Sequence, residues 1–385
     1  MAGCGGGGSS AAPPAAGLSL DPGDGQVTVR WAADAGVEYW LGYLAATTVS
    51  LVFGSPHTWV LNVSSPYVVS GLTNGTTYAF SVNGRTDGGP GGVGTPSVAT
   101  VPRPGGVNWN TKGAIGTTAL RAVAYDSSAN YVAVGSAGAI YKGTDGANWT
   151  KVTTGPNVDF RAEVYTLSKF IAVGTGGQVY YSTDIATWTA GTSGTSNALN
   201  AVAGNGSLAV AVGDNGTIRY SADGATWTAA ASVPTSNHLN GVSYAASGVW
   251  FAMGDNGTLL TSSDGSTWTA QTSGTNANLR AAATLLNTVY TYVVVGDAGT
   301  VLKSADGVTW TRTTLNPAVN LSRVVVPTTN SQFLAVGAAG SAFTSPDGIT
   351  WTARSTGTSA NLSSLLTAQV QYVVVGDTGV NLNSH

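Results

Sequence analysis

Short apolar runs separated by turn residues dominate the chain from about residue 104 onward. Each repeat of the pattern contains four such runs, which in one repeat span residues 199–203, 208–213, 217–220 and 226–229. Runs of this length, rich in β-branched residues and bounded by Gly, Asn or Asp, favour strands over helices. The repeats are marked by a Gly-x-x-Gly turn that starts at Gly135, Gly174, Gly213, Gly254, Gly296, Gly337 and Gly376.

A repeat of about 40 residues with four strands is typical of a β-propeller blade, because one blade can bury its faces only against two neighbours. The seventh repeat stops at Ser384-His385, before the Trp-containing strand that ends the other six. A matching segment, Gly106-Val107-Asn108-Trp109, precedes the first repeat. We therefore predict a seven-bladed β-propeller over residues 104–385, closed by an N-terminal outer strand that removes two exposed sheet edges.

Residues 17–103 follow a different pattern. The segment 26–31 alternates between polar and apolar residues up to Trp31, as a half-buried strand does, and Leu72 stands six residues before Tyr78 in a turn that leads to another strand. This segment resembles a fibronectin type III domain. The resemblance implies a β-sandwich in which Trp31 and Leu72 are buried and the Tyr78 hydroxyl bonds to the main chain. Such a domain serves as a spacer or as a ligand site, and the whole chain is predicted to be all-β.

Apart from Met1 and Cys4, residues 1–16 are Gly, Ser, Ala and Pro with almost nothing to bury, the composition of a flexible tether. The single cysteine, Cys4, follows Ala2-Gly3 and resembles the lipidation site at the end of a bacterial lipoprotein signal. The resemblance implies a lipid anchor at Cys4 and folded domains outside the cytoplasm, in the outer membrane, at the cell surface or secreted. The alternative is a disordered tail with an unmodified thiol.

Composition fits a secreted or surface-exposed β protein. Only 9% of residues are charged and 53 of 385 are Gly, whereas about a quarter of residues are charged on average. The net charge of −3 gives no general attraction to nucleic acid or to anionic lipid. No run of 18 apolar residues is present, so any membrane association is expected only through Cys4.

Five segments of the form Ser-x-Asp-x-x-Thr-Trp, starting at Ser182, Ser221, Ser262, Ser304 and Ser345, resemble the Asp box of sialidases and of bacterial neuraminidase repeats. Their alternation with Val-Gly turns also resembles the propellers of photosystem II assembly factors. The Asp carboxylate of such a segment can accept main-chain N–H bonds, so we predict a structural role in the hairpin between the third and fourth strands. The resemblance places the binding site on the opposite face.

That opposite face should contain the starts of the inner strands and the Gly-x-x-Gly turns. The residue after the first apolar position of each inner strand, or in one strand two places after it, is polar: Arg121, Arg161, Asn200, Asn240, Arg280 and Arg323, with serines at 322 and 363. The turns add Asp214, Asp255, Asp297 and Asp377. These side chains either bind a ligand or peptide by charge-assisted hydrogen bonds, or pair with one another and fix the blades.

An enzymatic role is the less favoured alternative. The segment around Phe160-Arg161 partly matches a sialidase motif, and Glu163 and Tyr165 lie close in sequence, but Glu38 is the only other Glu. A glycoside hydrolase needs two positioned carboxyl groups or an activated Tyr, and neither can be assigned. His57, His238 and His385 are too far apart in sequence to suggest a metal site, so no metal or cofactor is expected.

We therefore expect a non-enzymatic binding or assembly platform that engages a protein or glycan partner. Two rival classes remain open: an extracellular glycan-active enzyme, and a structural subunit of a surface layer, filament or adhesin. Nucleic acid is not expected as a partner.

Overall fold

The computed structural model of the chain describes residues 9–11, 14, 17–23, 25–51, 55–103, 105–126, 128, 130–153, 155–286, 288–326, 332–368 and 371–384. Cys4, the predicted lipidation site, and His385 lie outside the described residues. The chain divides into two compact units, Met1–Gly105 with His385, and Gly106–Ser384.

The first unit consists of two antiparallel sheets. One has the order β1 (Ser9–Ala11), β7 (Tyr78–Thr86), β4 (Glu38–Leu44), β5 (Thr58–Val63), with β8 (Val98–Thr100) also paired to β7. The other has the order β2 (Ser19–Gly23), β3 (Gln26–Arg30), β6 (Tyr67–Val69). Trp31 and Leu72 are buried in a core shared by both sheets, and the Thr73 amide donates to the Tyr78 hydroxyl at 3.2 Å. The main-chain bond that the sequence implied for Tyr78 is present.

Strand β1 falls inside the segment that the sequence predicts to be a flexible tether. Ser9–Ala11 pair in antiparallel register with Gly84–Thr86 of β7, and the Ser9 and Thr86 hydroxyls are 2.9 Å apart. At these three residues the prediction of a free tether is wrong, because the edge of β7 offers unpaired main-chain groups that an extended segment can satisfy.

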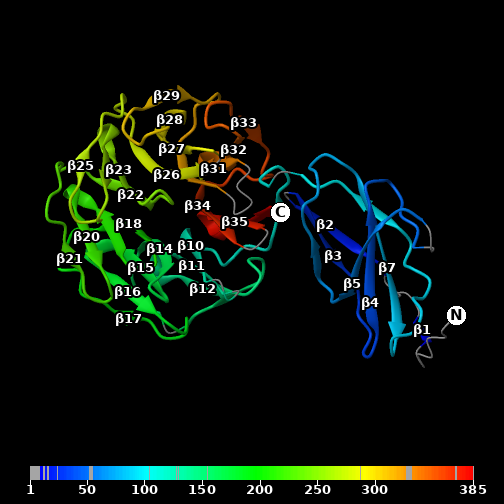
Figure 1. Cartoon of the computed structure of the whole chain (residues 1–385). Helices are drawn as coiled ribbons and strands as arrows, with labels where there is room; N and C mark the ends of the chain where they lie inside the picture. Colours follow the sequence, from blue (N-terminus) through cyan, green and yellow to red (C-terminus); the bar gives the residue numbers. More distant parts are fainter. Residues whose placement is uncertain are drawn as a thin grey trace. The chain divides into compact units, whose positions relative to one another are not determined.

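The second unit contains, among its described residues, seven four-stranded antiparallel sheets that follow one another around a ring (Figure 1). We number them one to seven in chain order. Sheet one comprises β10 (Leu120–Tyr125), β11 (Tyr131–Gly135), β12 (Ile140–Gly143) and β13 (Trp149–Lys151). Sheet two comprises β14 (Phe160–Thr166), β15 (Lys169–Gly174), β16 (Val179–Ser182) and β17 (Thr189–Ala190). Sheet three comprises β18 (Leu199–Gly204), β19 (Ala209–Gly213), β20 (Ile218–Ser221) and β21 (Thr228–Ala229). Sheet four comprises β22 (Leu239–Tyr244), β23 (Trp250–Gly254), β24 (Leu259–Ser262) and β25 (Thr269–Ala270).

Sheets five and six continue the same order. Sheet five comprises β26 (Leu279–Leu286), β27 (Tyr290–Gly296), β28 (Thr300–Ser304) and β29 (Thr311–Thr314). Sheet six comprises β30 (Leu321–Val325), β31 (Phe333–Gly337), β32 (Ala342–Ser345) and β33 (Thr352–Arg354). Sheet seven comprises β34 (Leu362–Ala368), β35 (Gln371–Gly376), β36 (Asn381–Ser384) and β9 (Asn110–Thr111). The first strand of each sheet contacts the first strand of the next, and β34 contacts β10.

Sheet seven therefore combines the two ends of the unit. Asn110 and Thr111 of β9 pair with Asn383 and Leu382 of β36. The Gly106 amide also donates to the Ser384 hydroxyl at 3.0 Å, as the Gly224 amide donates to the Ser221 hydroxyl within sheet three at 2.8 Å. A segment from before the first repeat thus supplies the strand and the turn that the seventh repeat lacks.

Apolar side chains between adjacent sheets form the core of this unit. The cluster between sheets one and two contains Val132, Val134, Phe160 and Phe170, and similar clusters join the other neighbours. Side chains of a strand alternate between its two faces, so each middle strand packs against both neighbouring sheets. Burial on both faces explains why these strands read as continuous apolar runs.

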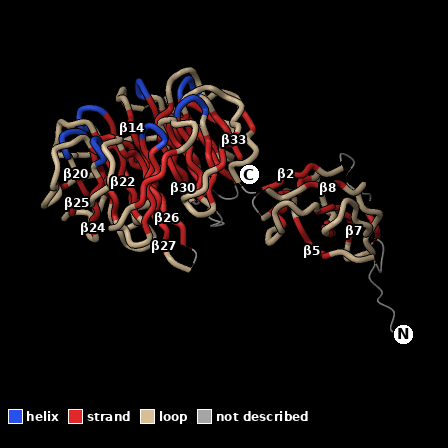
Figure 2. Tube along the Cα trace, turned by 90° about the horizontal axis from the view of Figure 1, so that it is seen from above, coloured by secondary structure: helices blue, strands red, loops and turns tan. Residues whose placement is uncertain are grey.

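Seven short 3-10 helices connect the second and third strands of the sheets among the described residues, and Figure 2 shows the short helices gathered on one face of the unit. They are η1 (Ser136–Gly138), η2 (Thr175–Gly177), η3 (Asp214–Gly216), η4 (Asp255–Gly257), η5 (Asp297–Gly299), η6 (Ala338–Gly340) and η7 (Asp377–Gly379). A Cβ on Gly340 would come within 1.8 Å of the Thr358 carbonyl oxygen, and its φ is +68°. Both facts account for the second glycine of the repeated turn.

The connections between the third and fourth strands lie at the opposite ends of those strands. We call five of them, which begin at Ser182, Ser221, Ser262, Ser304 and Ser345, the Asp turns. In the turn of sheet four, the Asp264 carboxylate accepts bonds from the amides of Ser266 and Thr267 at 2.8 and 2.7 Å and from the Ser262 hydroxyl at 3.0 Å. All three bonds end on the Oδ1 atom of Asp264 and lie within the turn, as expected for a structural role.

Replacing Asp264 with Ala is expected to lower the free energy of unfolding by about 1 kcal/mol, because two amides lose their acceptor at an exposed turn. The bonds from the Thr267 and Ser266 amides lower the pKa of the Asp264 carboxyl below its usual value. This stabilisation is therefore full above the unfolded-state pKa near 4 and is lost as the pH falls through the lower folded-state pKa. Thermal melts of wild type and Asp264→Ala from pH 7 to pH 2 measure this stabilisation. A difference in melting temperature that does not change with pH would contradict its assignment to the ionised carboxylate.

Candidate functional site

The face with the short helices also holds the starts of the seven inner strands, β10, β14, β18, β22, β26, β30 and β34. Each inner strand begins at a buried Leu or Phe that pairs with the last Gly of the second strand, and the register then shifts by one residue. A β-bulge of this kind leaves one residue unpaired and changes the direction of its side chain. The unpaired residues are Arg121, Arg161, Asn200, Asn240, Arg280, Ser322 and Ser363.

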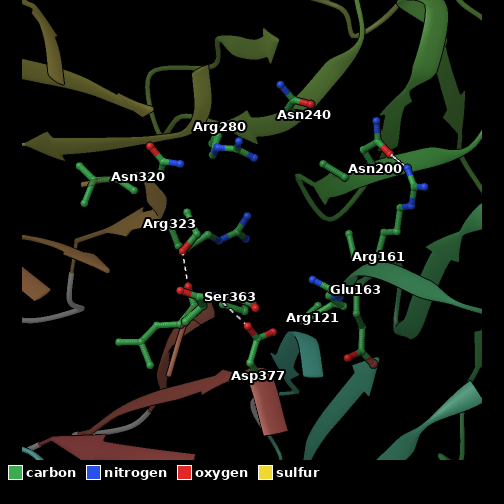
Figure 3. A pocket seen from close by; sticks show the side chains of 18 of the residues that line it. Arg121, Arg161, Glu163, Asn200, Asn240, Arg280, Asn320, Arg323, Ser363 and Asp377 are labelled. Carbon is green, nitrogen blue, oxygen red and sulfur yellow. Dashed lines mark hydrogen bonds between the residues drawn. The ribbon is translucent and has the colours of Figure 1, made fainter. Parts of the chain in front are cut away.

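These bulged residues surround one cavity of about 390 Å³, shown in Figure 3. Its remaining lining comes from the next positions of the inner strands and from the short-helix turns, including Glu163, Arg323, Asn320 and Asp377. The structure thus brings together all six Arg and Asn residues predicted from the sequence. Of the four predicted Asp residues, only Asp377 lines the cavity.

The other three carboxylates bond to the bulged residue of their own sheet. Asp297 accepts two bonds from the Arg280 guanidinium, at 2.6 and 3.0 Å. The amide groups of Asn200 and Asn240 donate to Asp214 and Asp255 at 2.9 and 2.7 Å. Asp377 accepts from the Asn361 amide at 2.9 Å. The turn carboxylates therefore position the bulged side chains, and the charge of Arg280 is neutralised.

Arg161 is only partly compensated. Its guanidinium donates to the Asn200 side chain, and its distance to the Asp214 carboxylate is 3.9 Å. Asp214 also lies 3.2 Å from His238 Nδ1 and accepts from Asn200, so several donors share one carboxylate. The Arg161 side chain is 41% exposed, which leaves its charge accessible from the cavity.

Two further arginines of the cavity lining are unpaired within the described part of the chain. Among the described residues, neither Arg121 nor Arg323 makes a hydrogen bond or an ion pair. Arg121 is exposed, and Arg323 is partly buried. Removal of water by the surrounding protein lowers the pKa of the Arg323 guanidinium. Among the described residues, the cavity consequently carries unpaired positive charge at Arg121 and Arg323 and partly compensated positive charge at Arg161.

Glu163 is the one other titratable residue in the lining besides Asp377 and the arginines. Its side chain is 95% buried, since only 5% is exposed, and both carboxylate oxygens lack a hydrogen-bond partner. Burial raises its pKa well above the ordinary value for Glu. Tyr165 packs against Phe170 in the core and does not line the cavity, so the sialidase-like combination of Glu163 with Tyr165 does not meet there.

The described residues hold no group of three or more His, Cys, Asp or Glu residues placed to bind a metal ion. None of their helices is long and apolar enough to cross a membrane.

Comparison with known proteins places the fold. No protein-family model and no curated protein sequence matches the chain. Solved structures do: YCF48 bound to D1 peptide is 17% identical over 71% of this chain and 96% of that one, with a TM-score of 0.60. Virginiamycin B lyase from Staphylococcus aureus with quinupristin is 7% identical over 72% and 98%, with a TM-score of 0.64. The WD40 β-propeller domain of Doa1 is 9% identical over 72% and 97%, with a TM-score of 0.59.

These neighbours are β-propellers. The second unit is therefore a β-propeller, as the repeat predicted. At such low identities the likeness establishes the fold alone.

Some functional features of this face were not predicted from the sequence. The side chain of the residue before an inner strand accepts a hydrogen bond from the main-chain amide of the left-handed residue in the preceding short-helix turn. The donor and acceptor pairs are Ala137 to Asp159, Asn256 to Asn278, Ala298 to Asn320 and Ala339 to Asn361. These bonds join adjacent sheets at the cavity rim. The sequence feature that could have predicted these bonds is the recurrence of Asn or Asp at the position before the inner strand. The burial of Glu163 had a weaker signal, a lone acidic residue where other repeats are apolar.

Proposed function

We propose that this protein is a non-enzymatic platform that binds an acidic segment of a protein partner at the mouth of the propeller cavity. In this proposal the seven sheets are the blades of one closed propeller, and the first unit is a fibronectin type III spacer that presents it outside the cytoplasm. The observation that carries the proposal is that, among the described residues, the charge of Arg121 is unpaired and that of Arg161 only partly compensated, on one open face. Arginine binds carboxylates through paired, charge-assisted hydrogen bonds.

The lining also favours an acidic ligand over a neutral glycan. It contains arginine, asparagine and serine side chains but no aromatic one, whereas aromatic faces supply much of the contact area in many binding sites. A likeness to YCF48, whose structure contains a bound D1 peptide, supports a propeller of this kind as a peptide-binding scaffold. The proposal for this chain rests on its own arginines.

Charge reversal tests this proposal. The double variant Arg121→Glu with Arg161→Glu is expected to weaken binding to acidic peptides on a synthetic array by about 30-fold, which corresponds to about 2 kcal/mol. Because the interaction is electrostatic and exposed, wild-type binding should also fall steeply between 50 and 500 mM salt, concentrations at which the screening length falls from about 14 to about 4 Å. Circular dichroism melts should show that the variant remains folded.

A matched control reverses two charges on exposed outer strands. Lys151 on β13 and Arg312 on β29 are exposed and do not line the cavity, so Lys151→Glu with Arg312→Glu changes the net charge equally. If both double variants lose acidic-peptide binding equally, the effect is general electrostatics and the face is wrongly assigned. An array on which wild type shows no preference for acidic peptides would also overturn the proposal.

A further inference from the structure

One level of the inner strands is uniform except at a single residue. The position after each bulge pairs with the second strand in the same register: Ala122 with Val134, Ala162 with Val173, Ala201 with Val212, Gly241 with Met253, Ala281 with Val295, Arg323 with Val336 and Ser364 with Val375. Six of these seven residues are Ala, Gly or Ser. Arg323 is thus the only long side chain at this level, and Figure 3 shows it pointing into the open space bordered by Arg121 and Arg161.

Arg323 is held there without compensation. Among the described residues it has no hydrogen-bond or ion-pair partner, although a guanidinium carries five N–H donors. Neither acidic side chain of the cavity lining forms an ion pair with it: Asp377 accepts from the Asn361 amide, and the buried Glu163 carboxyl has no hydrogen-bond partner among the described residues. Removing a charge from water without pairing it is costly. An anion from outside the protein would supply the partner that this guanidinium lacks among the described residues.

We propose that the propeller cavity contains a binding site for a small oxyanion, the carboxylate or phosphate group of a small molecule, and that Arg323 is its central ligand. Arg121 borders the same space and adds a second uncompensated guanidinium. Four small residues of this level line the cavity and leave the space that the ligand occupies: Ala122, Ala162, Ala201 and Ser364. The cavity of about 390 Å³ is in the usual range for a small-molecule site.

This inference is separate from the proposed protein partner, because it concerns the interior level of the cavity and a ligand small enough to enter it. The peptide test depends on Arg121 and Arg161 at the exposed face. The test below depends on Arg323. Either proposal can therefore fail without the other.

The experiment measures binding of inorganic phosphate and of succinate to the full chain by isothermal titration calorimetry and by thermal shift, at constant ionic strength set with chloride. We compare wild type with Arg323→Ser, because Ser already occupies the equivalent position, Ser364, in sheet seven. Binding of at least one anion should weaken tenfold or more in Arg323→Ser. Arg323→Lys, which keeps the charge but not the planar fork, should retain part of it. The control Arg312→Ser, on an exposed outer strand, should bind as wild type does.

A second readout is stability without added anion. Arg323→Ser removes an unpaired, partly buried charge, so its melting temperature should equal or exceed that of wild type. Binding of phosphate alone identifies a phosphate-bearing ligand, and binding of succinate alone identifies a carboxylate. The proposal is overturned if neither anion binds wild type up to about 50 mM, well above the millimolar affinities of weak sites. Equal binding by wild type and Arg323→Ser overturns it as well.

Discussion

Deleting residues 105–112 is expected to lower the melting temperature of the propeller by about 7 °C or more, because a loss of about 4 kcal/mol or more is divided by an unfolding entropy of about 0.6 kcal/mol/K in a unit of this size. The deletion removes β9, whose residues Asn110 and Thr111 pair with β36. It also removes the Gly106 amide that bonds to Ser384 and the Trp109 ring that packs beside the core between sheets six and seven. The ring would then contain an exposed strand edge.

A second variant separates strand loss from a shortened connection. Residues 106–111 are replaced by six alternating Gly and Ser residues, which keep the length but remove the Trp109 side chain and weaken the strand. Both variants should melt early and become sensitive to limited proteolysis after residue 371, in β35 and β36. Unchanged melting of the propeller in both would refute closure by this strand.

Replacing Glu163 with Val is expected to stabilise the protein by about 2 kcal/mol at pH 7, because a buried carboxyl group without a partner is removed. Glu163 pairs with Ala172 of β15. The residues at this register in the other inner strands are apolar: Val123, Val202, Val242, Ala282, Val324 and Leu365. Valine is already accepted at this place in four of the sheets.

The gain should depend on pH with a defined sign. Burial raises the folded-state pKa of Glu163 above its ordinary value. Between the unfolded-state pKa of about 4.5 and the folded-state pKa, the folded protein binds more protons than the unfolded one, so wild-type stability falls as the pH rises. The advantage of Glu163→Val should therefore grow above about pH 4.5 and level off above the folded-state pKa. Urea denaturation at several pH values measures it.

The chain offers a matched control, because Glu38 is its only other Glu and is exposed on β4. Glu38→Val should change stability little and without this pH dependence. If instead Glu163→Val is less stable than wild type at pH 7, the carboxyl group has a compensating partner such as a buried water, and its burial is not a cost.

Sequence alone determined the β-propeller and the residues that surround its cavity. Both follow from local pattern: an apolar run bounded by Gly and Asn specifies a strand wherever it occurs, and repetition places equivalent residues at equivalent points of a ring. The partner of the unfinished seventh repeat was also readable, because Gly106 to Trp109 match the missing segment. The same reasoning located Arg121, Arg161 and Arg280 at one register before any bulge was visible.

Tertiary structure decided which of these side chains are free. Arg280 and Arg121 occupy the same place in their repeats, yet Arg280 is bound by Asp297, while sheet one has Ser136 in the turn where Asp297 stands. Arg323 and Glu163 are each the one exception at a position where the other repeats have a small or an apolar residue. Their consequences arise only when neighbouring sheets surround them and exclude water. Charge compensation and burial depend on distances between segments far apart in the chain, and a one-dimensional pattern does not contain those distances.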